Sequence, residues 1–251
     1  MKKHQKNKFV ISSCSTFLLS LSLLGTISTG VEAQNKSIYT NKKNQVTFEP
    51  PRGDKPQQTA GGASRGGQCL SDSKEANSPI IPLLPTNSPA LTVKSHPTLL
   101  VYVPETSATE AYFAVRDNNE EYDYQTILPI GDSEGIISLT LPQDAPDLDM
   151  NQDYQWSLVL MCDGKLRPDS PVVKGNIKRV ATNNYMSQKL TQAGLLESAA
   201  IYGKAGIWYD TVASLAELKT TKPNSDYVSN NWENLLKTVG LERVAQAKFV
   251  E

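Results

Sequence analysis

The hydrophobic period of the chain changes once, close to residue 183, and this change limits the folds that the sequence can adopt. Before it, over residues 91–180, apolar residues form short runs, several with the repeat of two that is typical of β-strands. After it, over residues 187–250, apolar residues recur at steps of three and four, which is the spacing of a helix face. Strands grouped before helices predict the α+β class rather than an alternating α/β fold.

The strand-like part of the chain is expected to form a β-sandwich over residues 90–182. Residues 98–103 are nearly all apolar, as in a central strand, whereas residues 154–161 alternate apolar and polar side chains. Turn residues such as Asp163 and Gly164 separate the runs. Seven short strands at this spacing predict a sandwich like those of immunoglobulin and fibronectin type III domains. The runs are residues 91–93, 98–103, 111–115, 122–126, 136–141, 154–161 and 172–180.

One motif narrows the sandwich prediction. Leu148 and Tyr154 are six residues apart, and they precede Trp156 in the next predicted strand. This spacing is similar to the tyrosine corner of sandwich domains, in which the tyrosine hydroxyl bonds to the chain a few residues upstream. The alternative is an ordinary half-buried tyrosine at the start of a strand. We assign Leu148, Tyr154 and Trp156 to a structural tyrosine corner.

Residues 183–251 are expected to form a C-terminal helical hairpin or bundle. Gly206 interrupts the apolar pattern between the first two predicted helices, and Gly240 stands where a left-handed helix cap belongs. The hairpin would pack on the sandwich. The three apolar helix faces fall in residues 190–200, 208–218 and 232–239.

Aromatic residues in the helical region form a candidate partner surface. Trp208, Tyr209 and Asp210 are consecutive, and Trp232 lies in the following predicted helix. Aromatic residues are enriched at protein interfaces. They occur in helix cores as often or more, so internal packing is the favoured interpretation and a partner surface is the alternative. If the residues form an interface, an apolar groove beside the two indoles would hold a partner peptide.

Residues 1–33 are typical of a secretory signal peptide. Basic residues precede a mostly apolar, uncharged stretch, and Ala33 closes a small-residue cleavage site. One competing interpretation is an uncleaved membrane anchor. Another is lipidation at Cys14, although that cysteine lies near the start of the apolar stretch instead of after it. Cleavage predicts an exported protein, periplasmic or extracellular, with no stable membrane span in the mature chain. Residues 34–89 are rich in Pro and Gly and are expected to form a long, partly disordered arm.

Two cysteines, Cys69 and Cys162, remain after removal of the predicted signal peptide. An even number of cysteines in an exported protein favours a disulfide bond. A bridge between them would join the arm to the sandwich covalently. The alternative is a pair of buried thiols.

Few residues suit metal or catalytic chemistry. Asp147, Asp149, Asn151 and Asp153 resemble the start of a calcium loop, but the sixth and twelfth positions lack the Gly and Glu of an EF-hand. A weak calcium site of oxygen ligands is the remaining option. His96 is the single histidine after signal cleavage, and one imidazole cannot make a zinc site without other ligands. We predict no catalytic residue, no resident metal and no cofactor.

A set of motifs spans nearly the whole mature chain. They are Phe48-x-Pro50-Pro51, Arg65-Gly66-x-x-Cys69, residues 96–104, Tyr154-x-Trp156, residues 177–180, residues 206–210 and residues 232–241. In this order they resemble the family of exported cyanobacterial proteins known as domain of unknown function nine hundred and twenty-eight. The resemblance implies export and a shared architecture, and it implies no activity.

The function predicted from these features is that of an exported, non-enzymatic binding or assembly module of the cell envelope. Its partner would be an envelope protein or a glycan. A net charge of −1 argues against a nucleic-acid partner. One alternative is an envelope enzyme that uses paired carboxylates on glycans. Another is an adaptor that binds a peptide through its helical hairpin.

Overall fold

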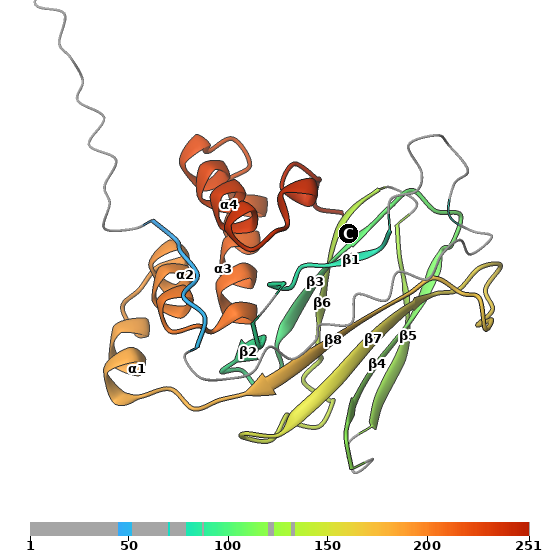
Figure 1. The fold of residues 1–251 in the computed structure, drawn as a ribbon, viewed down its shortest axis with the longest axis horizontal. Coiled ribbons are helices and arrows are strands. Elements are labelled where there is room, and N and C mark those ends of the chain that lie inside the picture. The colour runs from blue at the N-terminus through green and yellow to red at the C-terminus, as the bar shows by residue number, and fades with distance from the viewer. Residues whose placement is uncertain are drawn as a thin grey trace, which may run out of the picture. The chain divides into compact units, whose positions relative to one another are not determined.

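The computed structural model describes residues 45–51, 70, 79–86, 88–119, 123–131 and 134–250 (Figure 1). The predicted signal peptide of residues 1–33, Cys14, Cys69 and much of the predicted arm lie outside the described residues. The described part of the chain contains two β-sheets followed in sequence by four α-helices. The α+β class predicted from the change of hydrophobic period is therefore confirmed.

The larger sheet has five strands in the order β2-β8-β7-β4-β5. All neighbours are antiparallel except β2 and β8, which are parallel. The strand β5 pairs with β4 on one side and is an edge of this sheet. The strands are β2 (Leu91–Thr92), β4 (Glu110–Asp117), β5 (Asp123–Pro129), β7 (Asp153–Leu160) and β8 (Val172–Arg179).

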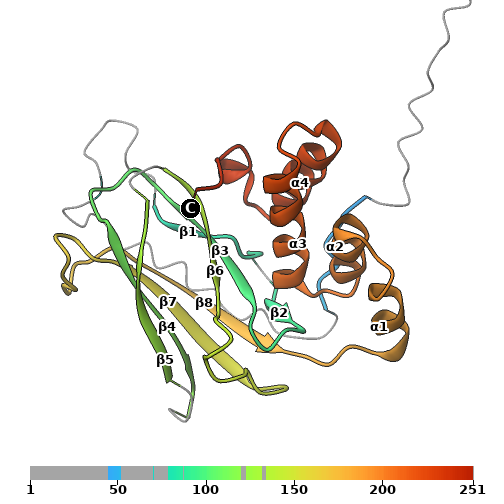
Figure 2. The same cartoon turned by 180° about the vertical axis from the view of Figure 1, so that it is seen from behind.

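The smaller sheet has three antiparallel strands in the order β1-β3-β6. They are β1 (Ile81–Pro82), β3 (Thr98–Val103) and β6 (Gly135–Thr140). The five residues of β3 after Thr98 are all buried, in keeping with their continuous apolar sequence. Helix α3 (Trp208–Thr221) packs on β3, and in two opposite views the helices gather on the β3 side, away from β4 and β5 (Figure 2). Helix α3 thus contacts β3 of the smaller sheet and β2 of the larger sheet.

The helical region begins with two helices where the sequence predicted one. An uninterrupted face over residues 190–200 was expected, but α1 (Asn184–Leu190) ends before α2 (Leu195–Lys204) begins. Gly194 takes the N-cap position of α2, and glycine is unfavourable inside a helix because it loses more backbone entropy than other residues. The chain then continues through α3 into α4 (Asp226–Thr238).

Two glycines end helices as the sequence predicts. Gly206 (φ +74°) separates α2 from α3, and Gly240 (φ +82°) follows α4. Both are in the left-handed region, which residues with a Cβ rarely adopt. The short 3-10 helix Glu242–Val244 follows Gly240 and leads to the C-terminal segment.

The described pieces of the predicted arm belong to the core. Val46 and Leu83 are buried, and the ring of Phe48 lies 5.0 Å from that of Trp208 in an edge-to-face arrangement. The backbone N–H of Val46 donates to the side-chain oxygen of Asn231 at 2.9 Å. These pieces pack on helices far away in sequence, so their local sequence gave little sign of order.

Among the described residues, no helix has both the length and the apolar character required for a membrane crossing.

Candidate functional site

A cavity of about 940 Å³ lies between β5 and β6, which are edge strands of the two sheets. This volume is within the range of sites that bind small molecules or peptide side chains. Residues from β4, β5, β6, the end of α3 and the C-terminal segment line it.

The first wall of the cavity is the inward face of β5. Exposed and half-buried residues alternate along this strand, because successive side chains of a β-strand point to opposite faces. Tyr124, Thr126 and Leu128 line the cavity, whereas Ile127 points to the other face and is 53% exposed. Phe113 of β4 lies beside them, with its ring 6.4 Å from that of Tyr124. This wall is mostly apolar but remains only partly covered.

The second wall is formed by β6 and the C-terminal segment. The N–H of Ile136 donates to the carbonyl of Lys248 at 2.7 Å, and the N–H of Val250 donates to the carbonyl of Ile136 at 3.0 Å. These bonds form a parallel bridge between Ile136 and Phe249. A Cβ at Gly135 would lie 2.6 Å from the Lys248 carbonyl, so glycine permits the close approach of the two segments.

The charged side chains that line the cavity are basic in the described part of the chain. Lys219 and Lys248 are among the residues that line it, while no Asp or Glu of the described chain does so. The ammonium of Lys219 donates to the hydroxyl of Ser229 at 3.0 Å. Within the described residues, neither lysine forms a salt bridge. The cavity therefore combines apolar walls with positive charge at its border.

The aromatic residues of the helices are packed inside the protein, as the favoured interpretation predicted, and the alternative of a partner surface is wrong. Trp208 and Trp232 are each 0% exposed, and Tyr209 and Asp210 are each 1% exposed. Each indole N–H bonds to a backbone carbonyl, that of Trp208 to Leu83 at 2.7 Å and that of Trp232 to Ala245 at 3.1 Å. Their apolar faces are covered by chain segments that the helix period does not reveal. An adaptor groove beside these indoles is therefore ruled out.

Asp210 connects α3 to the larger sheet. Its carboxylate oxygen Oδ2 accepts bonds from the Thr92 hydroxyl at 2.8 Å and the Val93 N–H at 3.1 Å. Burial raises the pKa of this carboxyl above its ordinary value, and the two hydrogen bonds oppose that rise. Asp210 does not line the cavity, so the structure gives it a role in holding the end of β2.

Tyr154 makes the upstream contact that motivated the tyrosine-corner prediction. Its hydroxyl oxygen accepts a hydrogen bond of 2.8 Å from the N–H of Asp149. Leu148, the residue before Asp149, is buried, and Trp156 is buried two residues after Tyr154. Desolvation by burial is the main cause that raises the pKa of Tyr154. All three side chains serve to pack the chain before and within β7.

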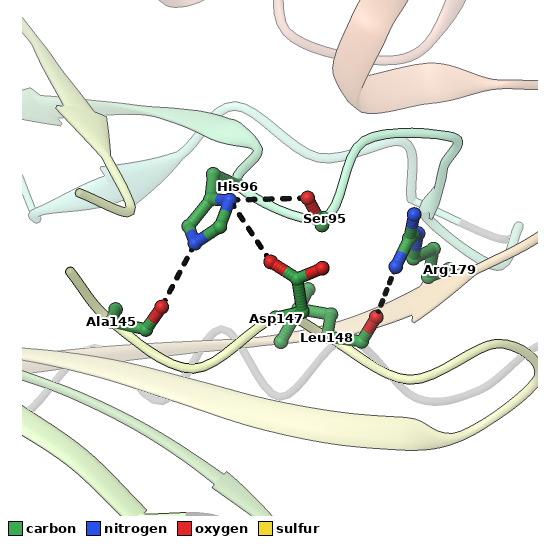
Figure 3. A network of polar contacts seen from close by, with 6 residues as sticks. All are labelled: Ser95, His96, Ala145, Asp147, Leu148 and Arg179. Atoms are coloured by element: carbon green, nitrogen blue, oxygen red, sulfur yellow. Dashed lines mark hydrogen bonds and ion pairs between the residues drawn. The ribbon is translucent and has the colours of Figure 1, made fainter. Parts of the chain in front are cut away.

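His96 organises the same loop from the other side (Figure 3). Its Nε2 lies 2.9 Å from the carbonyl oxygen of Ala145, and its Nδ1 lies 3.1 Å from the Ser95 hydroxyl and 3.5 Å from a carboxylate oxygen of Asp147. Arg179 of β8 donates to the carbonyl of Leu148 at 2.7 Å. These contacts hold the loop between β6 and β7 in place.

The candidate calcium ligands do not converge. Asp147 faces His96, Asp153 pairs with Lys178 at 3.2 Å, and Asn151 has a left-handed backbone with φ of 62°. In the part of the chain that is described, no group of three or more His, Cys, Asp or Glu side chains could hold a metal ion. The acidic spacing that suggested calcium serves a turn and its ion pairs.

Cys162 is buried two residues after the end of β7, while Cys69 lies outside the described residues. Leu70, the residue after Cys69, forms an isolated bridge with Thr106. The N–H of Met161 donates to the carbonyl of Glu110 at 2.9 Å, so Cys162 lies near the segment that follows Thr106. The predicted disulfide remains a prediction.

Sequence reasoning did not find the cavity. The alternation of Tyr124 and Thr126 with polar residues was visible, but it predicts only a two-faced strand. The moderately polar character of these inward residues was the one available signal, because a closed core would favour larger aliphatic side chains. The pairing of the C-terminal segment with β6 joins residues more than a hundred positions apart and has no local signature.

The family model described as Domain of Unknown Function (DUF928) matches residues 60–249. No curated protein matches the chain.

Proposed function

The chain belongs to the family described as Domain of Unknown Function (DUF928), and from the architecture of this member we propose an exported, non-enzymatic binding or assembly module. Its binding site is the cavity between β5 and β6. The proposal concerns a site, because a fold by itself does not determine a function.

The observation that carries the proposal is the partly covered apolar wall of β5. Tyr124 and Leu128 face the cavity, and no other side chains cover them fully, so both are only half-buried. Concave sites with apolar walls and a few polar groups are the usual form of ligand sites, and an apolar surface left open on a folded protein commonly marks an interaction site.

Export is supported by the N-terminal sequence. A basic start, an apolar stretch and the small-residue site at Ala33 are typical of a secretory signal. The pair Cys69 and Cys162 suits an oxidising compartment. The immunoglobulin-like character of the two sheets is part of the same proposal, with the Tyr154 contact to Asp149 as its main support. The edge of a sheet carries unpaired backbone N–H and C=O groups, to which another chain can pair.

A hydrolase with paired carboxylates has less support than a binding module. Such an enzyme needs two acids facing each other across its substrate, and the cavity lining includes no Asp or Glu among the described residues. Burial raises the pKa of the Asp210 carboxyl, but this group accepts hydrogen bonds from Thr92 and Val93. Glu217 lines a neighbouring pocket of about 430 Å³, which shares Ser138 and Thr220 with the cavity.

The proposal is tested by a substitution on β5 that fills the cavity. Replacement of Thr126 by Trp places an indole into the space, while Ile127→Trp places the same side chain on the opposite, exposed face. The probe is N-phenyl-1-naphthylamine, an apolar dye whose fluorescence rises in apolar sites. We expect the wild type and I127W to bind it alike, and T126W to bind it more than about tenfold more weakly.

Thermal unfolding curves establish that both variants are folded. Equal dye binding by T126W and I127W would overturn the proposal, as would a wild type that binds no dye.

A further inference from the structure

We infer that an extended segment of a partner chain adds as a strand to the free edge of β6, with apolar side chains at alternate positions and acidic residues between them. This inference rests on the proposed binding role of the cavity. It names the class of ligand that the cavity takes.

The free edge follows from the register of β6. Ile136 stands opposite Tyr102 of β3 but exchanges its N–H and C=O bonds with the C-terminal segment. In an antiparallel pair, hydrogen-bonded and non-hydrogen-bonded residues alternate. Ser138 and Thr140, two and four residues further along, must therefore direct their backbone N–H and C=O groups away from β3 as well.

No described segment pairs with this part of β6. Among the described residues, the C-terminal segment forms backbone hydrogen bonds with β6 only at Ile136, in the parallel bridge to Phe249. Ser138 and Thr140 are exposed, and both line the cavity. The C-terminal segment thus occupies the first position of a strand beside β6 and leaves the remainder of that edge open.

The open edge favours a peptide over a hydrocarbon chain. An acyl chain in the cavity would cover the backbone groups of Ser138 and Thr140 without offering them hydrogen bonds, which is unfavourable. An extended peptide provides a donor and an acceptor at every second residue. Addition of a strand to a sheet edge is an established mode of peptide recognition, in which alternate side chains enter pockets.

The walls define the side chains that such a peptide needs. On one of its faces, alternate side chains would meet Phe113, Tyr124 and Leu128 of the larger sheet, which favours apolar residues. Lys219 and Lys248 supply positive charge with no carboxylate in the described lining. Charge complementarity therefore favours acidic residues in the same peptide.

The first experiment uses a blocked heptapeptide that alternates Val and Glu, and measures displacement of N-phenyl-1-naphthylamine from the full-length mature chain. A peptide that alternates Val and Lys is the charge control. We expect the acidic peptide to displace the dye at about a tenfold lower concentration than the basic one, and added salt to reduce the difference.

Two N-methylated versions of the acidic peptide test the backbone bonds. One carries methyl groups on the valine nitrogens and the other on the glutamate nitrogens. In a strand, N–H groups of alternate residues point to opposite sides, so one version is expected to lose at least about tenfold in affinity and the other to bind nearly as well as the parent. Equal binding by both would overturn strand addition.

A third experiment changes the protein instead of the peptide, and compares Ser138→Pro with Ser138→Ala. Proline removes the outward N–H of Ser138 and is tolerated on sheet edges when that N–H faces away from the sheet, so the ladder between β3 and β6 is preserved. Both variants remove the same hydroxyl from the cavity wall, so we expect S138P and S138A to bind the dye equally. Only S138P lacks the outward N–H, so we expect it to bind the acidic peptide about tenfold or more weakly than S138A does.

These outcomes separate the inference from the proposed function. A wild type that binds no dye rejects both, whereas normal dye binding with equal peptide binding by S138P and S138A rejects only strand addition. If S138P does not fold, the N-methylated peptides and Thr140→Pro decide the same question. A concentration-dependent dimer abolished by S138P would identify a second copy as the occupant and overturn the acidic partner segment.

Discussion

The indole N–H of Trp156 on β7 donates a hydrogen bond of 2.7 Å to the hydroxyl of Tyr209 on α3. The same hydroxyl donates to the backbone carbonyl of Asn176 on β8 at 2.8 Å. Both side chains are at most 1% exposed. A buried polar pair thus joins the larger sheet to the helices, and burial raises the pKa of Tyr209, which keeps the hydroxyl protonated as a donor.

Replacement of Tyr209 by Phe should destabilise the protein by about 1–3 kcal/mol, because it leaves the Trp156 N–H and the Asn176 carbonyl buried without their partner. Urea denaturation at neutral pH measures the change. Tyr185→Phe is the control, since Tyr185 is 67% exposed and its loss should be close to neutral. Equal stability of the two variants would show that the buried pair contributes little.

Gly175 is expected to tolerate no side chain. A Cβ at this position would lie 2.5 Å from the Trp156 ring and 2.6 Å from a methyl group of Leu84. Gly175→Ala should therefore destabilise the protein by about 1–3 kcal/mol through overpacking. The matched control is Gly194→Ala, where a Cβ would meet nothing within 4 Å; its expected cost is about 0.5 kcal/mol, from the N-cap preference. Thermal unfolding of the two variants would contradict this account if Gly194→Ala were the more damaging.

Tyr154→Phe removes the acceptor of the Asp149 N–H. The expected loss is about 1 kcal/mol, together with faster hydrogen exchange of the Asp149 amide, because the loop before β7 loses a local restraint. Tyr112→Phe serves as the comparison, since the Tyr112 hydroxyl bonds to Gln125 at an exposed position. Unchanged exchange at Asp149 would mean that the hydroxyl does not order the loop.

Asp210 should make stability fall with rising pH. Its pKa in the folded protein is raised above the ordinary 3.8, so the native state binds this proton more tightly than the unfolded state does. The free energy of unfolding then decreases as pH rises from the ordinary value through the raised one. Asp210→Asn retains an acceptor for Thr92 and Val93 but does not titrate, so its stability should fall less over this range. Urea denaturation at a series of pH values compares the two proteins, and parallel profiles would contradict the assignment.

The predicted disulfide between Cys69 and Cys162 has a direct chemical test. Alkylation of the secreted protein under denaturing, non-reducing conditions should label no thiol, and labelling after reduction should detect two. Reduction should also lower the unfolding temperature, because a bridge that closes a long loop contributes about 2–5 kcal/mol in small secreted domains. Labelling of two thiols before reduction would reject the bridge.

The elements of secondary structure were largely predictable, because they depend on local pattern. The apolar run of β3 indicated a strand covered on both faces, and Tyr154 lies next to the loop that its spacing indicated. Gly206 and Gly240 mark helix ends because left-handed backbone conformations favour glycine. The break at Gly194 was missed, since the apolar spacing continues across it.

The candidate site was not predictable from the same patterns. The positions of Trp208 and Trp232 fitted either a helix core or a partner surface, and Phe48, Phe249 and other distant residues bury them. Tyr124 suggested a buried face, yet it borders a cavity. In each case the sequence pattern showed that the side chain belongs to an apolar face, but it did not show what lies against that face.

The sequence by itself determined the α+β class, the approximate positions of strands and helices and the face of each that is apolar, because these follow from the period of side chains along a few turns or residues. Only the tertiary structure decided that Asp210 would be enclosed, that the segment ending at Val250 would pair with Ile136, and that β5 and β6 would border an open cavity. Those features arise from contacts between residues far apart in the chain, whose free energy depends on how whole layers fit together.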